Sequence, residues 1–285
     1  MQVLDKTAVN TRMAALSDML SASPGGQPFL AELQLDQLKV GVDLGAAYLV
    51  MLVLDANNRP LAGAYEFAQV VRDGLVVDFI GAVDRLKSIK SRLESQLGCT
   101  LQHAATAYPP GVSQAERRST AYVLESVGLD CRDLIDEPSA ANSVLGMRNG
   151  AVVDVGGGTT GIAILQDGKI VYTADEATGG THFSLVIAGA LNLSFEEAEA
   201  RKKQADQQAL LFSHIRPVME KVASIINRHV QGYAIEEISL VGGTAMFPGM
   251  DTVIQEWTGI PTWIPQHPMF VTPYGIAMQD GLHKN

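Results

Sequence analysis

The most informative segment of the chain is Ala151-Val152-Val153-Asp154-Val155-Gly156-Gly157-Gly158-Thr159-Thr160. Its apolar residues indicate a buried strand, and the glycines mark a tight loop at the end of that strand. Three consecutive glycines cost backbone entropy, and a purely structural hairpin would rarely need them. Because the loop has no Cβ atoms, a phosphate chain can lie against its backbone, and Thr159 or Thr160 adds a hydroxyl donor. A tight structural hairpin is the alternative interpretation.

The same arrangement occurs earlier in the chain, where Val40-Gly41-Val42-Asp43-Leu44-Gly45 precedes another apolar run. Asp43 aligns with Asp154 and Gly45 with Gly156, and each loop is followed by a strand, a turn and a further strand. A single Asp-x-Gly turn is weak evidence for a ligand site, but its repetition favours one. The exposed N–H groups suit phosphate oxygens, and the carboxylate suits Mg²⁺ or its water shell. The repeat predicts two similar halves that each open with a three-stranded meander.

The composition limits the kinds of protein that this chain can be. Its 285 residues suffice for one large or two medium domains, and 47% are hydrophobic against 18% charged, which excludes a disordered chain. The formal net charge of −10 argues against binding nucleic acid through a basic face. The 2 cysteines are too few for a disulfide scaffold, and neither a secretory signal nor a membrane-spanning run is found. We therefore expect a cytoplasmic protein with no nucleic-acid or membrane partner.

Apolar periodicity and capping residues predict the other elements. Helices are expected over residues 80–97 and 114–127, and Ser194 begins a further helix with a capping box. A long helix is expected over residues 207–229, and Pro217 should kink or break it. The alternation of strands and helices predicts an α/β fold.

An amphipathic helix is expected near the N-terminus, because apolar residues recur with a helical period at Val9, Met13, Leu16 and Leu20. A connector rich in glycine and proline follows it and ends at Pro28. Two interpretations stay open. The helix folds back onto its own domain, or it is a tethered docking peptide that presents its apolar residues to a groove on another protein.

Two further motifs complete the pattern. The strand expected at residues 235–241 ends in Gly242-Gly243, where glycines allow a flat ligand such as a nucleoside to approach the backbone. Asp136-Glu137-Pro138 begins a helix of small residues, and Glu137 is either a site residue or the cap of that helix. The loops are neither a Walker A motif nor a dinucleotide fingerprint, because the required glycine spacings do not occur.

As an ordered set, these motifs resemble the superfamily of actin, the sugar kinases and the DnaK-type chaperones. The likeness begins at about Lys39 and runs to the end of the chain. It rests on two phosphate loops, an adenosine motif and two connecting helices, at residues 40–47, 154–160, 240–248, 136–141 and 273–277. Residues 104–111 and 172–180 carry a narrower likeness to the ethanolamine-utilisation J family, whose members are chaperone-like and associated with bacterial microcompartments.

The resemblance implies a two-lobed, actin-like ATPase fold with duplicated ribonuclease H-like domains and a nucleotide cleft. An N-terminal helix and linker would occupy residues 1–28. Lobe I would comprise residues 35–149 with a C-terminal helix at 273–282, and lobe II residues 150–266 with a small helical insertion at 194–232. The implied ligands are ATP or ADP with Mg²⁺.

The resemblance also assigns site residues by position. Asp43, Glu137 and Asp154 would be catalytic: the two aspartates hold Mg²⁺ through water, and Glu137 orients the attacking water. The implied phosphate-binding residues are Gly45, Gly156, Gly157, Gly158, Thr159 and Thr160. The implied adenosine-binding residues are Gly242, Gly243 and Lys203, with Glu199 and Lys202 as further candidates in the same region.

Two departures from the family pattern bear on hydrolysis. Ala46 and Ala47 stand where related first loops carry threonine or serine, and the lysine that DnaK-type chaperones use for hydrolysis has no counterpart. We therefore expect ATP binding with slow hydrolysis or none. The resemblance implies a chaperone-like or reactivating factor for ethanolamine utilisation, whose client is a pathway enzyme or a microcompartment shell protein. An actin-like assembly or scaffold protein is the alternative, followed by a small-molecule kinase.

Overall fold

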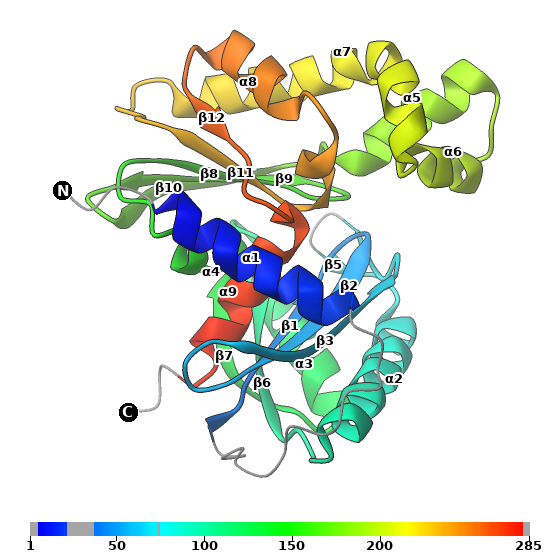
Figure 1. Ribbon diagram of the computed structural model, residues 1–285, viewed down its shortest axis with the longest axis vertical. Helices are drawn as coiled ribbons and strands as arrows, with labels where there is room; N and C mark the ends of the chain where they lie inside the picture. The colour runs from blue at the N-terminus through cyan, green and yellow to red at the C-terminus, as the bar shows by residue number, and fades with distance from the viewer. Residues whose placement is uncertain (1–4, 22–36, 73–74, 282–285) are drawn as a thin grey trace. The chain divides into compact units, whose positions relative to one another are not determined.

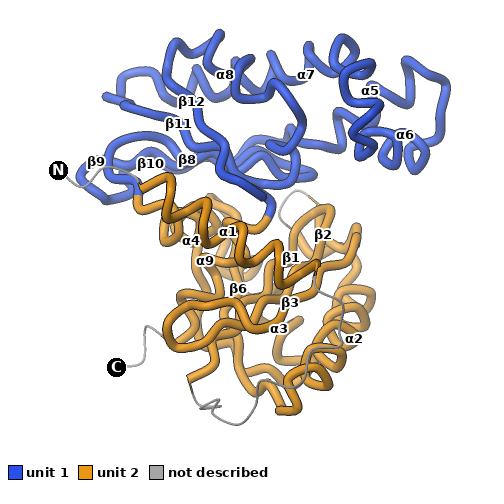
Figure 2. The backbone as a smooth tube through the Cα atoms, in the orientation of Figure 1, with its two compact units in different colours: residues 1–3, 147–269 blue, residues 4–146, 270–285 orange. Residues whose placement is uncertain are grey.

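The computed structural model describes residues 5–21, 37–72 and 75–281, and the predicted connector lies outside them from residue 22 onward. The chain divides into two compact units, which Figure 2 shows in different colours. Unit 2 comprises Leu4–Gly146 and Phe270–Asn285, and unit 1 comprises Met1–Val3 and Met147–Met269. The C-terminal segment therefore returns to the unit formed by the first half of the chain.

Unit 2 is built on a five-stranded sheet in the order β3-β2-β1-β6-β7 (Figure 1). The first three strands form an antiparallel meander, and β6 and β7 extend it in parallel from β1. The strands are β1 (Lys39–Leu44), β2 (Tyr48–Leu54), β3 (Pro60–Phe67), β6 (His103–Tyr108) and β7 (Asp130–Asp136), beside a small sheet of β4 (Val71–Arg72) and β5 (Leu75–Val76). The helices are α1 (Lys6–Ser21), α2 (Phe79–Leu97), α3 (Gln114–Ser126), α4 (Glu137–Leu145) and α9 (Val271–Gln279).

Unit 1 repeats this sheet in the order β10-β9-β8-β11-β12, again with an antiparallel meander followed by two parallel strands. The strands are β8 (Gly150–Val155), β9 (Thr160–Gln166), β10 (Lys169–Glu176), β11 (Ile238–Val241) and β12 (Thr262–Trp263). The helices are α5 (Gly180–Leu191), α6 (Phe195–Lys202), α7 (Ala205–Val230) and α8 (Met250–Thr258), with the 3-10 turns η2 (Gly243–Met246) and η3 (Pro268–Phe270). The α/β fold class and the duplicated meander are confirmed.

The N-terminal helix α1 packs within unit 2, against β3. Val9, Met13 and Leu16 are at most 2% exposed, and the side chains of Met19 and Leu20 lie beside Gly63 of β3. The apolar stripe predicted for this helix is thus covered by its own unit. This burial favours the folded-back interpretation over the docking peptide.

The other helices lie close to their expected residues, with one correction. The side chain of Asp78 caps α2, and Ser194 caps α6 through the expected capping box. Of the kink or break predicted at Pro217, the break does not occur, because α7 continues through this residue as one helix. Pro217 and Ser213 are both exposed, so water can reach the carbonyl of Ser213, which has no N–H partner in Pro217.

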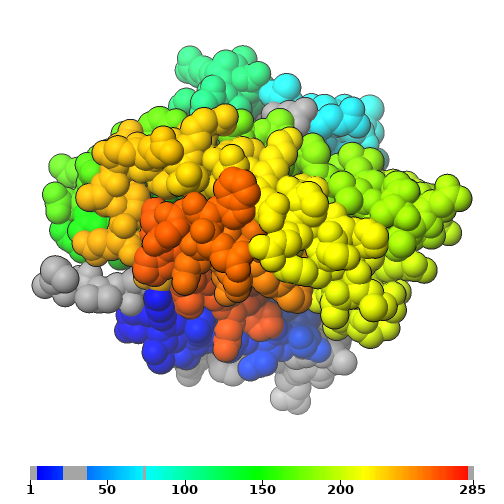
Figure 3. Space-filling model, turned by 90° about the horizontal axis from the view of Figure 1, so that it is seen from above, coloured from blue at the N-terminus to red at the C-terminus, as the bar shows by residue number. Residues whose placement is uncertain are grey.

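α7 supplies one side of the unit 1 core, and α8 lies beside it. The outer surfaces of the two helices adjoin in Figure 3, in yellow and orange. Arg216 of α7 forms ion pairs at 2.9 Å with Glu220 of the same helix and Glu256 of α8. Among the described residues, no helix combines the length and the apolar character needed to cross a bilayer.

Candidate functional site

The two Asp-x-Gly loops form matching hairpins, one in each unit. The aspartate of each is the next-to-last residue of strand β1 or β8. In unit 2 the N–H of Gly45 donates to the carbonyl of Tyr48 at 3.0 Å, and in unit 1 the N–H of Gly156 donates to the carbonyl of Thr159 at 3.0 Å. These two glycine amides close their own loops. The donors available to a phosphate must therefore be sought in the residues that follow each glycine.

The carbonyl groups of the triple-glycine loop are held by neighbouring segments of unit 1. The carbonyl of Gly156 accepts hydrogen bonds from the N–H of Gly180 at 2.9 Å and from the hydroxyl of Thr244 at 2.7 Å. The carbonyl of Gly157 accepts one from the N–H of Thr181 at 2.8 Å. In a trans peptide the C=O and N–H bonds point in opposite directions. The N–H groups of Gly157 and Gly158 are therefore turned away from these segments.

The two threonines of the loop differ in their surroundings. Thr159 lies in the loop and is half-buried. Thr160 already belongs to β9, is 0% exposed, and donates its hydroxyl to the carbonyl of Thr178 at 2.6 Å. The hydroxyl of Thr160 is thus committed inside the fold, and its prediction as a phosphate donor is wrong.

The segment after β11 lies directly against Asp154. Asp154 pairs with Val241 in β11, and Gly242 follows with a φ of 89°. A Cβ on Gly242 would lie 2.3 Å from Oδ1 of Asp154, so no larger residue fits there without displacing the carboxylate. Gly243, by contrast, is exposed. The predicted adenosine motif and the second hairpin therefore meet at Asp154.

A buried ionic cluster lies at the start of α5. The ammonium group of Lys202 donates to the carbonyl of Gly180 at 3.0 Å, to the hydroxyl of Ser184 at 2.9 Å and to Glu199 at 2.6 Å. Ser184 donates to the same carboxylate at 2.5 Å. This cluster ties α6 to the first turn of α5, whose Gly180 N–H holds the triple-glycine loop.

Burial and charge act in opposite directions on this pair. Burial lowers the pKa of Lys202 below its ordinary value, although the neighbouring Glu199 opposes the shift. Burial alone would raise the pKa of Glu199, but the charge of Lys202 and the hydrogen bonds from Lys202, Ser184 and Lys203 outweigh it, so this pKa is lowered. Glu199 therefore stays a carboxylate at neutral pH.

Lys203, which the resemblance assigns to adenosine binding, is the more exposed lysine of this cluster. It is the C-cap residue of α6, its side chain is 43% exposed, and it pairs with Glu199 at 3.1 Å. Lys202, not Lys203, reaches the start of α5. One residue along a helix turns the side chain by about 100°, so sequence position alone did not separate the two lysines.

In unit 2, the residues at the start of α4 have separate roles. Asp136 caps the helix, because its carboxylate accepts hydrogen bonds from the N–H and the hydroxyl of Ser139 at 2.9 and 2.7 Å. Glu137 is the first helical residue, so the alternative that Glu137 is the cap is wrong. Asp43 is half-buried near the end of β1, one residue after Val42, whose carbonyl accepts the buried hydroxyl of Thr106 at 2.8 Å.

Asp175 is an acidic residue near the second hairpin that the sequence did not single out. It pairs across the sheet with Gly161 of β9, which in turn pairs with Asp154. A Cβ on Gly161 would lie 3.7 Å from Oδ1 of Asp175 and 4.0 Å from Cβ of Asp154. The two aspartates therefore flank one glycine, an arrangement that only the strand register reveals.

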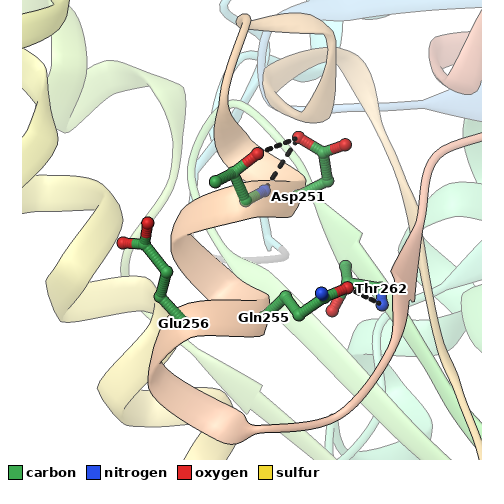
Figure 4. Close-up of a pocket in the computed structure, with 5 residues that line it drawn as sticks. Asp251, Gln255, Glu256 and Thr262 are labelled. Carbon is green, nitrogen blue, oxygen red and sulfur yellow. Dashed lines mark hydrogen bonds between the residues drawn. The ribbon is translucent and has the colours of Figure 1, made fainter.

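Figure 4 shows a pocket on α8 with a volume of about 210 Å³. It is lined by Asp251, Thr252, Gln255, Glu256 and Thr262. The Gln255 side chain accepts the N–H of Thr262 at 3.1 Å, and none of these residues belongs to the hairpin, the ionic cluster or the adenosine motif. The described residues also contain no group of three or more histidine, cysteine or acidic side chains placed to hold a metal ion directly.

Comparisons with known proteins place this arrangement in a family. The sequence profile of the type IV pilus assembly protein PilM matches residues 138–280, and that of the MreB/Mbl proteins matches residues 63–198. The solved structure of MreB5 of Spiroplasma citri bound to ADP has a TM-score of 0.69 at 18% identity, over 86% of this chain and 96% of that one, which shows a shared fold.

Two relatives are much more similar in sequence. The ethanolamine utilization protein EutJ of Salmonella typhimurium is 45% identical over 84% of this chain and 85% of its own length. The crystal structure of EutJ from Carboxydothermus hydrogenoformans has a TM-score of 0.87 and 40% identity, and the match covers 96% of this chain and 99% of that one. With the duplicated sheets and matching hairpins described above, these similarities show that the chain belongs to the EutJ family of ethanolamine utilization proteins and has the actin-like ATPase fold.

Proposed function

We propose that this protein binds Mg-ATP and acts as a chaperone-like or reactivating factor in ethanolamine utilisation, in association with a bacterial microcompartment. Hydrolysis would be slow or absent. The pathway part of the proposal is supported by family membership. The nucleotide part is supported by a single observation, the triple-glycine hairpin whose carbonyls are tied back at Gly156 and Gly157.

The residues of unit 1 fit a magnesium-bound phosphate chain. With the carbonyls held inward, the N–H groups of Gly157 and Gly158 are directed away from the neighbouring segments, as donors to phosphate oxygens require. Asp154 is half-buried beside Gly242 and offers a carboxylate suited to ordering the water shell of Mg²⁺. The bound metal ion would neutralise phosphate charge. Asp43 and Glu137 of unit 2 are proposed to order metal-bound and attacking water, respectively.

The nucleoside would be held by a different part of unit 1. We assign this role to Gly242, Gly243 and Lys203, because Gly180, Ser184 and Glu199 already take the three donors of the Lys202 ammonium group. Lys203 is exposed enough to contribute a charge at the rim of the same region. An adenosine moiety needs polar groups for its ribose and an open backbone for its base; the ammonium group of Lys203 and the exposed backbone of Gly243 are suited to these two needs.

Isothermal titration calorimetry tests the nucleotide proposal. We expect heat of binding with Mg-ATP for the unmodified protein and at least a tenfold weaker affinity for Asp154→Asn, because a carboxylate that orders the metal's water shell is lost. Asp251→Asn on α8 is the matched control, since it removes an acidic charge from the same unit outside the site. Absence of binding and of any thermal shift at millimolar Mg-ATP would overturn the proposal.

The chaperone part has a specific competitor. The match of the MreB/Mbl profile to residues 63–198 favours a second candidate, an actin-like protein that assembles with nucleotide. Light scattering and negative-stain electron microscopy with and without Mg-ATP distinguish the two. Filaments that depend on ATP support assembly, whereas a particle of constant size that restores the activity of an inactivated ethanolamine-pathway enzyme supports the reactivating factor.

A further inference from the structure

We infer that Thr244 is a positioning residue, whose hydroxyl sets the orientation of the triple-glycine loop and thereby couples the nucleoside end of the site to its phosphate end. The inference rests on the proposed function, because it assumes that the loop binds phosphates. It assigns Thr244 no contact with the nucleotide.

The position of Thr244 supports this role. It follows Gly242 and Gly243 on the 3-10 turn η2 and is half-buried. Its hydroxyl donates to the carbonyl of Gly156 at 2.7 Å, and this carbonyl also accepts the N–H of Gly180 at 2.9 Å. Two donors from segments distant in sequence thus fix one peptide unit of the loop.

That peptide unit determines where a donor of the loop points. Because the peptide is planar and trans, a carbonyl of Gly156 held by Thr244 forces the N–H of Gly157 in the opposite direction. A glycine loop has no side chains to restrict its rotation, so an external bond has to supply that restriction. Thr244 is therefore suited to presenting the N–H of Gly157 before a phosphate arrives.

Thr244 also connects this loop to the ionic cluster. A Cβ on Gly180 would lie 2.4 Å from the Thr244 hydroxyl oxygen, so the two residues are in close contact. The carbonyl of Gly180 accepts the ammonium group of Lys202 at 3.0 Å. Hydrogen bonds therefore connect Lys202 to Gly180 and Gly180 to Gly156. Thr244 adds a further hydrogen bond to Gly156, where the loop begins.

The test compares Thr244→Val, which keeps the shape and removes the hydroxyl, with Thr244→Ser, which restores it. Affinities for Mg-ATP, Mg-ADP and adenosine are measured by calorimetry. We expect Thr244→Val to lower the affinity for Mg-ATP and for Mg-ADP about tenfold, equivalent to about 1.4 kcal/mol in binding free energy. Its affinity for adenosine should fall less than about twofold. Thr244→Ser should recover most of the loss. Thr258→Val is the matched control, because the hydroxyl of Thr258 bonds only within its own helix end, to Ile254 and Ile260.

Hydrogen exchange of the amides in residues 155–159 provides a second readout that needs no ligand. We expect faster exchange at Gly156, whose N–H closes the loop by donating to the carbonyl of Thr159, in Thr244→Val than in the unmodified protein or in Thr258→Val. An equal loss of affinity for adenosine and for Mg-ATP would overturn the positioning role. An unchanged exchange rate together with an unchanged affinity for Mg-ATP would overturn it as well. If the unmodified protein binds no nucleotide, the proposed function fails, and the exchange experiment still decides whether Thr244 orients the loop.

Discussion

Replacement of Gly275 by alanine should destabilise unit 2, although the same change usually strengthens a helix. Gly275 lies inside α9, and a Cβ there would be 1.8 Å from the carbonyl oxygen of Ala140 in α4. Real Cβ atoms essentially never come within 3.0 Å of such an atom, so α9 and α4 must separate by at least 3.0 − 1.8 = 1.2 Å. A backbone carbonyl cannot rotate aside as a flexible side chain can. The shift therefore has to come from the packing of the two helices.

The expected magnitude follows from two opposing effects. Forcing extra volume into a close-packed contact costs about 1–3 kcal/mol, and a backbone obstacle places this contact at the upper end. The better helix propensity of alanine stabilises the helix by at most about 1 kcal/mol, which offsets part of this cost. We expect a net loss of about 2 kcal/mol, which corresponds to a thermal midpoint lowered by roughly 4–8 °C for a unit of this size.

Thermal unfolding followed by circular dichroism measures this difference. Gly189→Ala is the matched control, because Gly189 is also helical, is exposed on α5, and has no atom within 4 Å of an added Cβ. The control should melt at or slightly above the temperature of the unmodified protein. A Gly275→Ala variant that melts as high as Gly189→Ala would refute the steric argument and the close crossing of α4 and α9.

Three further predictions concern other parts of the chain. Met13→Ala, at a side chain that is 0% exposed, should lower the free energy of unfolding measured by urea titration by about 2–5 kcal/mol. If the helix were a docking peptide, the free energy of unfolding would stay unchanged. Gly242→Ala should abolish the calorimetric signal with Mg-ATP, because the added Cβ would lie 2.3 Å from Oδ1 of Asp154; an unchanged affinity would contradict the placement of that carboxylate. The lowered pKa of Glu199 means that its contribution to stability is present above its unfolded pKa and is lost as pH falls through its folded pKa. Urea titrations between about pH 5 and pH 3 should therefore show a steeper loss of stability for the unmodified protein than for Glu199→Gln.

The elements that the sequence predicts well are those encoded by neighbouring residues. The strands, the two hairpins and the helix caps follow from local patterns, because alternation, glycine and capping side chains act within a few residues of one another. The duplication was visible for the same reason, since Asp43 and Asp154 begin similar local patterns, each an aspartate followed two residues later by glycine. The sequence predicted a kink or a break at Pro217, and the break was wrong because the local rule ignores that water can solvate the carbonyl that loses its N–H partner.

The features that the sequence did not predict depend on contacts between distant segments. Thr159 and Thr160 are adjacent in the chain, and the sequence did not show that the Thr160 hydroxyl donates a hydrogen bond to the carbonyl of Thr178. Lys202 and Lys203 are chemically alike, and only the placement of α5 beside α6 distinguishes them. Thr244 lies in the predicted adenosine motif, but the sequence did not indicate its bond to the phosphate loop, because its partner Gly156 is far away in sequence. Site residues of this kind require the fold before they can be recognised.

Comparison of the two hairpins shows which of their shared features are needed to form the turn. Both copies keep the aspartate and the closing bond, from Gly45 to Tyr48 in unit 2 and from the aligned Gly156 to Thr159 in unit 1. The two residues inside the turn differ, however: Ala46 and Ala47 in the first copy, glycines in the second. If consecutive glycines were required to make this turn, the first copy could not form the same closing bond with alanines. The closing bond therefore does not by itself require the glycines at 157 and 158. Their missing Cβ atoms agree with two features: the close packing of this loop against Gly179 and Gly180, and the proposed approach of a ligand to its backbone.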